Sequence, residues 1–367
     1  YGRFRTWPSY GASPYSTFIG NNAYLFQLFC LGHGKFDVHQ IYIEDTELDE
    51  FTDIEYQIVE PGDAVTLFPD NVFTSTEVGG IELFGPNETS FTDWTSGYVA
   101  CPPLQQTTRI EVDVSLPRGM YFATGAVLST RQSVCEFQYR KIDDAGAILG
   151  PWTTGVIFDK TLKTPTPQRY TLEITVPLGR YEVRAVRTNN AELNHAGTSQ
   201  TKWLGLRAYL PSVLVYPGVT MLALKAKATN NLNDSASTRV NVVATRKLRV
   251  WDADTEVWVE NIATRNPVWA FCDVFTAEYG GRLPDEFLDL VRLAEIATTL
   301  ENEGISFDWV FDQKVTTWDA AKTVAKIARG VPILQGSNIS MVLERPQVLP
   351  VAMFSAENIL RDSFNYE

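Results

Sequence analysis

Two aspartates in an apolar segment, Asp308 and Asp312, have a spacing that acid–base chemistry can use. Two carboxyl groups held close together can act as acid and base in glycoside hydrolysis. Such pairs are also common by chance, and no neighbouring residue indicates a raised pKa or a nucleophile. We therefore interpret both aspartates as capping the segment and the turn that follows it.

Nucleophilic and cofactor chemistry find little support in this sequence. A Ser-His-Asp site would have to use His33, His39 or His195, and no Gly-x-Ser-x-Gly sequence occurs. Gly32-His33-Gly34 begins like a dinucleotide-binding loop, but Asp37 stands at the third glycine position and no helical pattern opens there. We expect a hairpin turn at this point, no cofactor and no enzyme activity.

Two groups of residues could supply metal ligands. Cys30, His33 and His39 lie on alternating strand patterns, need special geometry to converge and lack a fourth ligand. A second group has carboxylates at alternate positions, Asp252, Asp254 and Glu256. It lacks the glycine and the terminal glutamate of an EF-hand loop. We interpret the first group as core and turn residues, the second as a solvated turn, and expect no metal site.

Aromatic side chains could bind a ligand of another kind, because flat rings can stack on sugars. Trp94, Trp152 and Trp203 lie in a region with strand patterns, where such platforms would stand on a sheet. Core packing and subunit contacts explain these rings equally well, since buried rings contribute large areas. We favour packing, and keep the three tryptophans as the candidate ligand-binding residues of an alternative function, recognition of a saccharide or receptor on a host surface.

The composition limits the class of protein. A length of 367 residues indicates two or three domains, and a hydrophobic content of 44% allows sizeable cores. The net charge of −13 and the lack of basic runs argue against nucleic-acid binding. No apolar run reaches the roughly 18 residues of a membrane helix. The chain begins at Tyr1 without Met, so we expect it to be part of a longer polypeptide.

The four cysteines lie far apart in the sequence, at Cys30, Cys101, Cys135 and Cys272. Most of them stand in apolar strand or helix patterns, so we expect buried free thiols and folding in a reducing cytoplasm. One disulfide, for example between Cys101 and Cys135, remains an open alternative.

These residues must be positioned by a chain of mixed α+β structure that is predominantly β. Residues 94–210 alternate polar and apolar side chains in several short stretches without a helical pattern, which predicts a β-sandwich. In one stretch Glu111 and Asp113 fall opposite the apolar residues. Pro177–Ala185 resembles the sixth strand of a fibronectin type III domain.

The sandwich interrupts a β domain whose two parts are residues 1–93 and 211–263, so strands from the two parts would pair. We expect an extended arm over residues 1–20 and a strand covered on both faces over 23–31. Further expected elements are a strand over 220–229, a polar tip at 230–234 and a returning partner strand over 240–244.

Residues 264–367 form a small α+β domain. We expect three helices, over residues 266–279, 285–302 and 317–329. Asn266 fits the cap of the first helix and Pro267 its first position. In the second helix, Val291 falls on the apolar face. The remaining expected elements are an alternating strand over 305–312 and a hairpin of 331–335 with 339–344.

Several stretches resemble the central region of phage tail tip proteins, the family of the lambda-like tip attachment or host-specificity protein J. The stretches are Tyr1-Gly2-Arg3, Leu28–Gly34, Ile43–Thr46, Thr220–Thr229, Arg265–Trp269, Tyr279-Gly280-Gly281, Phe307–Asp312 and Trp318–Ala321. Their order and spacing also match, and the resemblance covers most of the chain, with residues of about 95–210 the least similar.

The resemblance implies a structural protein of the virion, part of the baseplate hub that closes the distal end of the phage tail and supports host attachment. It further implies a homotrimer that contacts other tail tip proteins, such as the distal tail protein and the tape measure, and assembles in the bacterial cytoplasm. In the family, further C-terminal regions contact the receptor, so no residue here is assigned that role.

Overall fold

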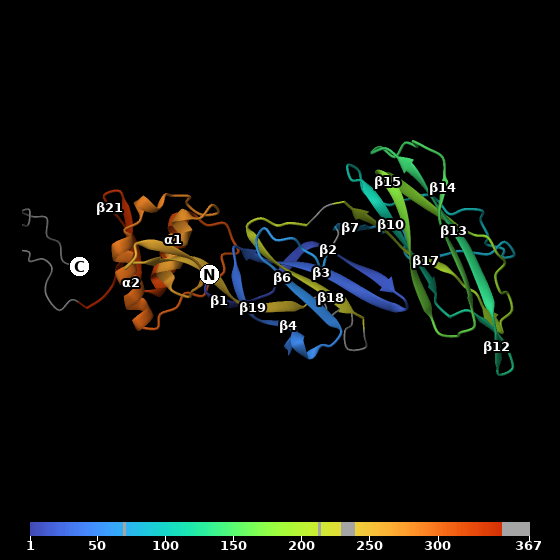
Figure 1. The fold of residues 1–367 in the computed structure, drawn as a ribbon, viewed down its shortest axis with the longest axis horizontal. Helices are drawn as coiled ribbons and strands as arrows, with labels where there is room; N and C mark the ends of the chain where they lie inside the picture. The colour runs from blue at the N-terminus through green and yellow to red at the C-terminus, as the bar shows by residue number, and fades with distance from the viewer. Residues whose placement is uncertain (69–70, 212–213, 229–238, 347–367) are drawn as a thin grey trace, which may run out of the picture. The chain divides into compact units, whose positions relative to one another are not determined.

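The computed structural model describes residues 1–68, 71–211, 214–228 and 239–346, which belong to two units. An α+β unit contains Tyr1–Phe4 with Thr245–Glu367, and a β unit contains Arg5–Ala244. All α-helices of the described residues lie in the α+β unit, while strands dominate the chain (Figure 1). This confirms the mixed α+β fold that is predominantly β.

One sheet of the β unit joins strands that are far apart in the sequence. Its antiparallel order is β2 (Ser9–Ile19), β3 (Asn22–His33), β18 (Val219–Lys227) and β6 (Ile54–Val59). The pairing of β3 with β18 joins segments from either side of the expected insertion, as the split-domain interpretation requires. The central residues Phe26–Phe29 are all buried, so β3 is covered on both faces as predicted.

Two expectations about this β domain are wrong. Residues 1–20 are not an extended arm, because β2 pairs with β3 and its Tyr15 ring stacks on Phe26 with centroids 4.9 Å apart. Residues 240–244 do not pair with β18, whose two edges are already taken by β3 and β6. They begin β19 (Val240–Asp252), which lies beside β4 (Phe36–Ile43). The expected tip at 230–234 lies outside the described residues.

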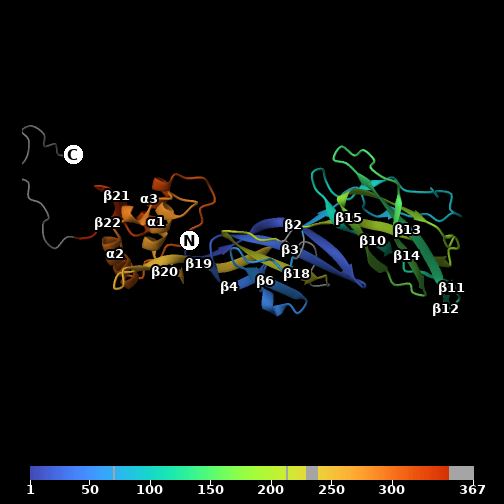
Figure 2. The same cartoon turned by 45° about the horizontal axis from the view of Figure 1, so that its top comes forward.

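The sandwich contains a strand that passes from one layer to the other. In β15 (Gln168–Arg187) the first part, up to Gly179, pairs with β10 (Thr107–Leu116), and the part from Arg180 pairs with β13 (Arg131–Ile142) (Figure 2). Strands that change sheets in this way form the corners of sandwiches. The hydroxyl of Tyr181 donates to the carbonyl of Pro177 at 2.5 Å, which fixes the bend.

The sandwich also begins earlier than expected. β7 (Asn71–Thr74) and β8 (Ile81–Glu82) both pair with β17 (Lys202–Leu210), and Val78 is buried in the same core. Residues 71–82 therefore belong with the sandwich rather than with the first part of the split domain. The remaining strands of the β unit are β5 (Thr46–Glu47), β9 (Tyr98–Val99), β11 (Tyr121–Thr124), β12 (Val127–Ser129), β14 (Thr153–Leu162) and β16 (Gly197–Thr198).

The α+β unit starts at Thr245, whereas the sequence placed this boundary at 264. Within it β19 pairs with β20 (Val257–Ala263). The ring of Trp258 lies 6.2 Å from that of Trp269 in the first helix, so the pair of strands shares the helical core. The other elements are α1 (Pro267–Thr276), α2 (Leu290–Asn302), α3 (Thr317–Ile327), β21 (Gly330–Gln335) and β22 (Asn338–Leu343), with β1 (Arg3–Thr6) crossing the boundary of the units.

The first helix and the hairpin of β21 and β22 are confirmed. The side chain of Asn266 accepts a hydrogen bond from the N–H of Val268 at 3.0 Å, the expected cap. The second helix begins later than predicted, because Leu288 is extended and bridges Ile339, so that Asp289 becomes the cap. As a result Val291 is 72% exposed rather than packed.

Residues 305–312 are not a strand, although their side chains alternate. Their backbone groups bond to separate parts of the unit instead of to one neighbouring strand. The N–H of Phe307 donates to the carbonyl of Arg265 at 2.8 Å, and that of Trp309 to the carbonyl of Tyr1 at 3.0 Å. The segment therefore connects Tyr1 with Arg265, the residue before the cap of the first helix.

Candidate functional site

The three candidate tryptophans lie in two different environments. Trp203 is fully buried, with its ring 5.4 Å from that of Phe137 and its indole N–H donating to the carbonyl of Gly205 at 2.9 Å. No face of this ring reaches solvent, which removes Trp203 from the side chains available to a ligand. The ligand hypothesis then depends on Trp94 and Trp152, both half-buried.

The structure brings Trp94 and Trp152 together through one arginine. The guanidinium carbon of Arg184 lies 4.1 Å from the ring centroid of Trp94 and 4.2 Å from that of Trp152. Arg140 lies 4.3 Å from the Trp152 ring. Cations at this distance from an aromatic face are attracted by its quadrupole. We call these four residues, Trp94, Trp152, Arg140 and Arg184, the tryptophan–arginine cluster.

Polar residues of β13 and β15 hold the arginines of this cluster in place. Arg184 donates to the side-chain oxygen of Gln138 at 2.7 Å, and Gln138 in turn donates to Glu136 at 2.9 Å. Arg140 forms an ion pair with Glu182. Burial, together with the charge of Arg140, lowers the pKa of Arg184.

Thr95, which follows Trp94, attaches the segment before β9 to the sheet. The N–H of Thr95 donates to the carbonyl of Ala185 at 2.9 Å, and the N–H of Ala185 donates to the Thr95 hydroxyl at 3.0 Å. A Cβ on Gly97 would lie 2.4 Å from a carboxylate oxygen of Glu182. The Arg184 guanidinium lies over one face of the Trp94 ring, so this arrangement fastens the loop that carries Trp94 to the sheet.

A second group of polar residues, which the sequence interpretation missed, lies buried in β10 and β17. Arg207 donates to Asp113 at 2.8 Å and to Glu111 at 3.0 Å, and the hydroxyl of Tyr209 donates to Glu111 at 2.7 Å. The side chains of Asp113 and Arg207 are each 3% exposed. We call Glu111, Asp113, Arg207 and Tyr209 the buried ionic network.

The electrostatics of this network are those of a compensated buried pair. Burial alone would lower the pKa of Arg207, but the hydrogen bonds and charge of Asp113 outweigh it and raise the pKa above its ordinary value. Burial and the neighbouring Glu111 carboxylate raise the pKa of Tyr209. Alternation placed Glu111 and Asp113 opposite the apolar residues of β10 but did not indicate that both are buried. The signal that would have found the network is the matching alternation of Arg207 and Tyr209 on the paired strand.

Four of the stretches that carry the family resemblance meet one another in the α+β unit. Gly2 has a φ of +68°, and a Cβ there would lie 2.0 Å from the carbonyl oxygen of Phe307. The N–H of Arg3 donates to Asp308 at 2.7 Å, and Arg265 donates to the same carboxylate at 3.0 Å. These contacts join three of the stretches in one place.

A fourth stretch joins them through Asp273. The hydroxyls of Tyr1 and Tyr279 both donate to the Asp273 carboxylate, the first at 2.6 Å. Arg246 donates to the Tyr279 hydroxyl at 2.9 Å. A Cβ on Gly280 would lie 2.2 Å from the carbonyl oxygen of Val274, so the glycines let the chain turn back onto the first helix. In these four stretches the resemblance therefore includes residues that hold the α+β unit together.

The carboxylate pair does not have the features of a catalytic acid. Burial raises the pKa of Asp308, but hydrogen bonds from Arg265 and the Arg3 backbone outweigh it and leave the pKa below its ordinary value. A general acid needs the opposite shift. Asp312 is exposed, and Asp308 serves as the anchor of the N-terminal residues.

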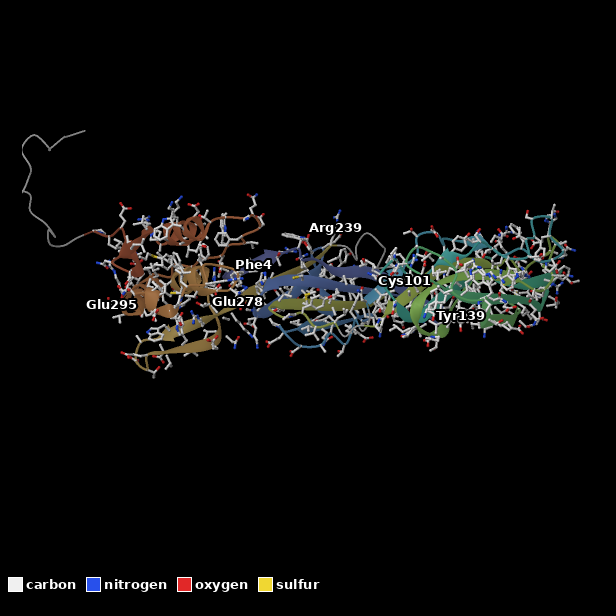
Figure 3. All side chains as sticks on the ribbon, turned by 90° about the horizontal axis from the view of Figure 1, so that it is seen from above. Phe4, Cys101, Tyr139, Arg239, Glu278 and Glu295 are labelled. Atoms are coloured by element: carbon white, nitrogen blue, oxygen red, sulfur yellow. The ribbon has the colours of Figure 1, made fainter. Side chains whose placement is uncertain are left out.

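The structure shows the surroundings of the cysteines and of the residues considered as metal ligands. All four cysteines are free, with Cys101, Cys135 and Cys272 buried and Cys30 half-buried. Figure 3 labels Cys101, which lies in the β unit. No three His, Cys, Asp or Glu side chains of the described residues gather as a metal site would require. Asp252 instead accepts a backbone N–H from Asp254 at 2.9 Å, which is the expected turn.

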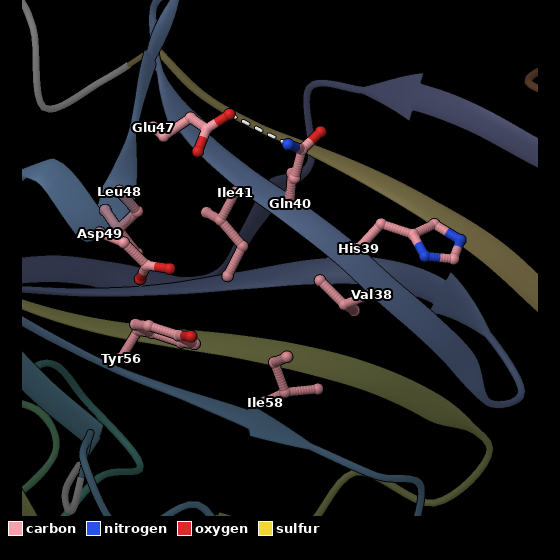
Figure 4. A pocket seen from close by; sticks show the side chains of 9 residues that line it. All are labelled: Val38, His39, Gln40, Ile41, Glu47, Leu48, Asp49, Tyr56 and Ile58. Atoms are coloured by element: carbon pink, nitrogen blue, oxygen red, sulfur yellow. Dashed lines mark hydrogen bonds between the residues drawn. The ribbon is translucent and has the colours of Figure 1, made fainter.

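A small cavity of about 80 Å³ lies between β4 and β6. Figure 4 shows Gln40 bonded to Glu47 on one side, at 3.0 Å, and Tyr56 and Ile58 on the other. The last two side chains are 46% and 38% exposed, although both are large and apolar.

Among the described residues, no helix is both long and apolar enough to cross a membrane.

Comparisons with known proteins give no family. No family model matches the chain, and no curated protein matches it. Among solved structures, a carbohydrate binding module from a glycoside hydrolase family 9 protein of Ruminococcus flavefaciens FD-1 is 11% identical, covers 38% of this chain and 98% of its own, and has a TM-score of 0.24.

Two viral structures match at a similar level. The receptor binding domain of spike protein P1 from bacteriophage PM2 is 13% identical over 38% of this chain and 94% of its own, with a TM-score of 0.22. A chain of infectious bursal disease virus is 14% identical over 59% of this chain and 50% of its own, with a TM-score of 0.18. Similarities at this level carry no argument about function.

Proposed function

We propose that this chain is a structural component of a phage or prophage tail tip, forming part of the baseplate hub that closes the distal tail end and supports host attachment. The proposal includes assembly as a homotrimer, contacts with other tail tip proteins and no catalytic activity. It is supported by the order and spacing of the stretches that resemble the tip attachment protein J family.

One structural observation carries the proposal. Residues of the resembling stretches that lie 305 positions apart, Arg3 and Asp308, are bonded to each other. Two stretches at opposite ends of the described chain are thus in direct contact, which supports the proposal that the similarity reflects a shared scaffold. Arg3, Arg265 and Asp308 use their polar groups in contacts within the α+β unit.

An exposed sheet edge supports the assembly part of the proposal. Within the described residues β6 ends its sheet, and it carries the exposed side chains of Tyr56 and Ile58. Unpaired edges with apolar side chains favour association, and proteins usually cover them. A second copy of the chain in a closed ring would do so.

Immunogold electron microscopy of particles from the source, with antibody raised against this chain, tests the proposal. We expect label at the distal end of the tail, and a trimeric mass for the hub extracted from particles. Label missing from intact and disrupted particles alike, with the protein free in the lysate, would remove the structural role.

A second candidate function is recognition of a host saccharide or receptor by the expected 94–210 insert. It is favoured only by the finding that two half-buried rings, Trp94 and Trp152, lie close together around Arg184. A glycan array tests it directly. Binding that disappears on Trp152→Ala would support this function, and an array without signal would leave the tryptophan–arginine cluster with its fastening role alone.

A further inference from the structure

A groove of about 370 Å³ opens in the β unit between the end of β2 and the strands β10 and β17. Its volume falls in the range of about 300–1,000 Å³ found for small-molecule sites. Phe18, Leu25 and Leu204 form its apolar walls, and Asp113 and Arg207 of the buried ionic network form its floor. Neither Trp94 nor Trp152 lines it, so it is separate from the tryptophan–arginine cluster.

The floor of the groove offers one unused hydrogen-bond acceptor. Oδ1 of Asp113 accepts from the Thr171 hydroxyl at 2.6 Å and from Arg207 at 2.8 Å. Oδ2 accepts only from the other guanidinium nitrogen of Arg207 within the described residues. A carboxylate oxygen has two lone pairs, so Oδ2 retains a position for one more donor.

Gly205 keeps this oxygen uncovered. It pairs with Asp113 in the register of β10 and β17 and lines the groove. A Cβ there would lie 3.0 Å from Oδ2 of Asp113 and 3.8 Å from a nitrogen of Arg207. Its φ is not among the positive values, so the backbone conformation does not demand glycine. Gly205 therefore leaves space next to the Asp113 carboxylate that a side chain would fill.

The chemistry of the lining selects a class of ligand. The Asp113 carboxylate can accept a hydrogen bond from a hydroxyl or N–H group of a ligand. The adjacent Arg207 guanidinium disfavours a cationic ligand, and the Asp113 and Glu111 carboxylates disfavour an anionic one. The apolar walls suit a flat apolar face, and the hydroxyls of Ser16 and Thr74 stand exposed at the rim. The guanidinium carbon of Arg169 lies 5.3 Å from the centroid of the Phe18 ring, so a ligand would use the opposite face of that ring. A neutral ligand that combines hydroxyl donors with an apolar face is a sugar ring.

We propose that this groove binds one neutral sugar unit, with a hydroxyl of the sugar donating to Oδ2 of Asp113 and the apolar face of the ring against Phe18. The site lies where the sandwich meets the split β domain, within one unit. The inference is independent of the tail tip role, because a structural hub piece needs no sugar site.

Saturation-transfer NMR on the full chain tests the inference, with glucose, galactose, mannose and N-acetylglucosamine as probes. We expect transfer to at least one of them, with a dissociation constant on the order of 1 mM. Gly205→Val fills the space above Asp113 and should weaken this binding at least tenfold. Gly150→Val is the matched control, because a Cβ there meets nothing within 4 Å and should leave binding unchanged.

Phe18→Ala is a second variant in the wall of the groove. It decides the outcome if thermal unfolding shows that Gly205→Val does not fold. It should also weaken binding at least tenfold. Three results would overturn the proposal: no transfer to any of the four sugars, a smaller loss in the folded groove variants, or binding that disappears on Trp152→Ala.

Discussion

Removing the guanidinium of Arg207 tests the energetics of the buried ionic network. In Arg207→Met the apolar stem is kept, but Asp113 remains 3% exposed with only the Thr171 hydroxyl as a donor. Glu111 is less affected, because Arg109 still pairs with it at 2.5 Å. Breaking one partner of a buried pair costs about 3–5 kcal/mol, since it leaves an uncompensated charge.

The assay is thermal and denaturant unfolding of the variant. At about 2–4 °C per kcal/mol for a unit of this size, the midpoint of the β unit should fall by roughly 6–20 °C. Arg118→Met replaces an exposed arginine of the same sandwich and should change the stability by less than about 0.5 kcal/mol.

The double variant Arg207→Met with Asp113→Leu separates pairing from packing. Replacing both partners by apolar residues should recover most of the lost stability, because no charge then remains uncompensated. If the costs of the two substitutions simply add, the carboxylate does not depend on Arg207 and the account of the network is wrong. The account is also refuted if the unfolding free energy of Arg207→Met alone lies within about 1 kcal/mol of that of the parent chain, the change typical of an ordinary substitution.

Three further predictions concern other parts of the chain. Gly2→Ala should destabilise the α+β unit by at least about 1–2 kcal/mol, because the φ of +68° is strained for alanine and its Cβ would meet Phe307; an unchanged denaturation midpoint would contradict this. Asp308→Asn should lower stability at pH 7. The pKa of Asp308 is depressed, so its contribution is present above the unfolded pKa of about 3.9 and is lost as the pH falls through the folded pKa; the two unfolding curves should therefore converge only in acid. Burial raises the pKa of Cys135 to about 11, so a thiol reagent at pH 8 should react with half-buried Cys30 first and with Cys135 only on unfolding, whereas equal rates in the native chain would show that the core is open.

The elements that were predicted well depend on neighbouring residues in the sequence. The cap of α1 needs only Asn266 and Pro267, and the hairpin of β21 and β22 needs only its turn. The start of α2 failed, because it is decided by the contact of Leu288 with Ile339, which no local pattern contains.

Contacts between distant parts of the chain also decide which of the candidate site residues are buried. Trp94, Trp152 and Trp203 are alike in a sequence, yet only Trp203 is in the core, since that depends on which strands face one another. Alternation correctly put Asp113 on the face away from the sandwich core. It could not show that the end of β2 covers this face, where the N–H of Phe18 donates to the Thr171 hydroxyl at 3.2 Å.

The structural role of the resembling stretches changes where the function of this chain should be sought. Tyr1, Gly2, Arg265 and Asp308 are bonded to or packed against other residues of the α+β unit, so substituting them tests folding and says little about partners. Partner contacts must use side chains that the fold leaves exposed, and those of Tyr56 and Ile58 on β6 meet that condition. A surface that mediates assembly should tolerate substitution in the isolated chain and fail only in the particle. This separates it from the buried ionic network, whose loss is measurable in the isolated chain.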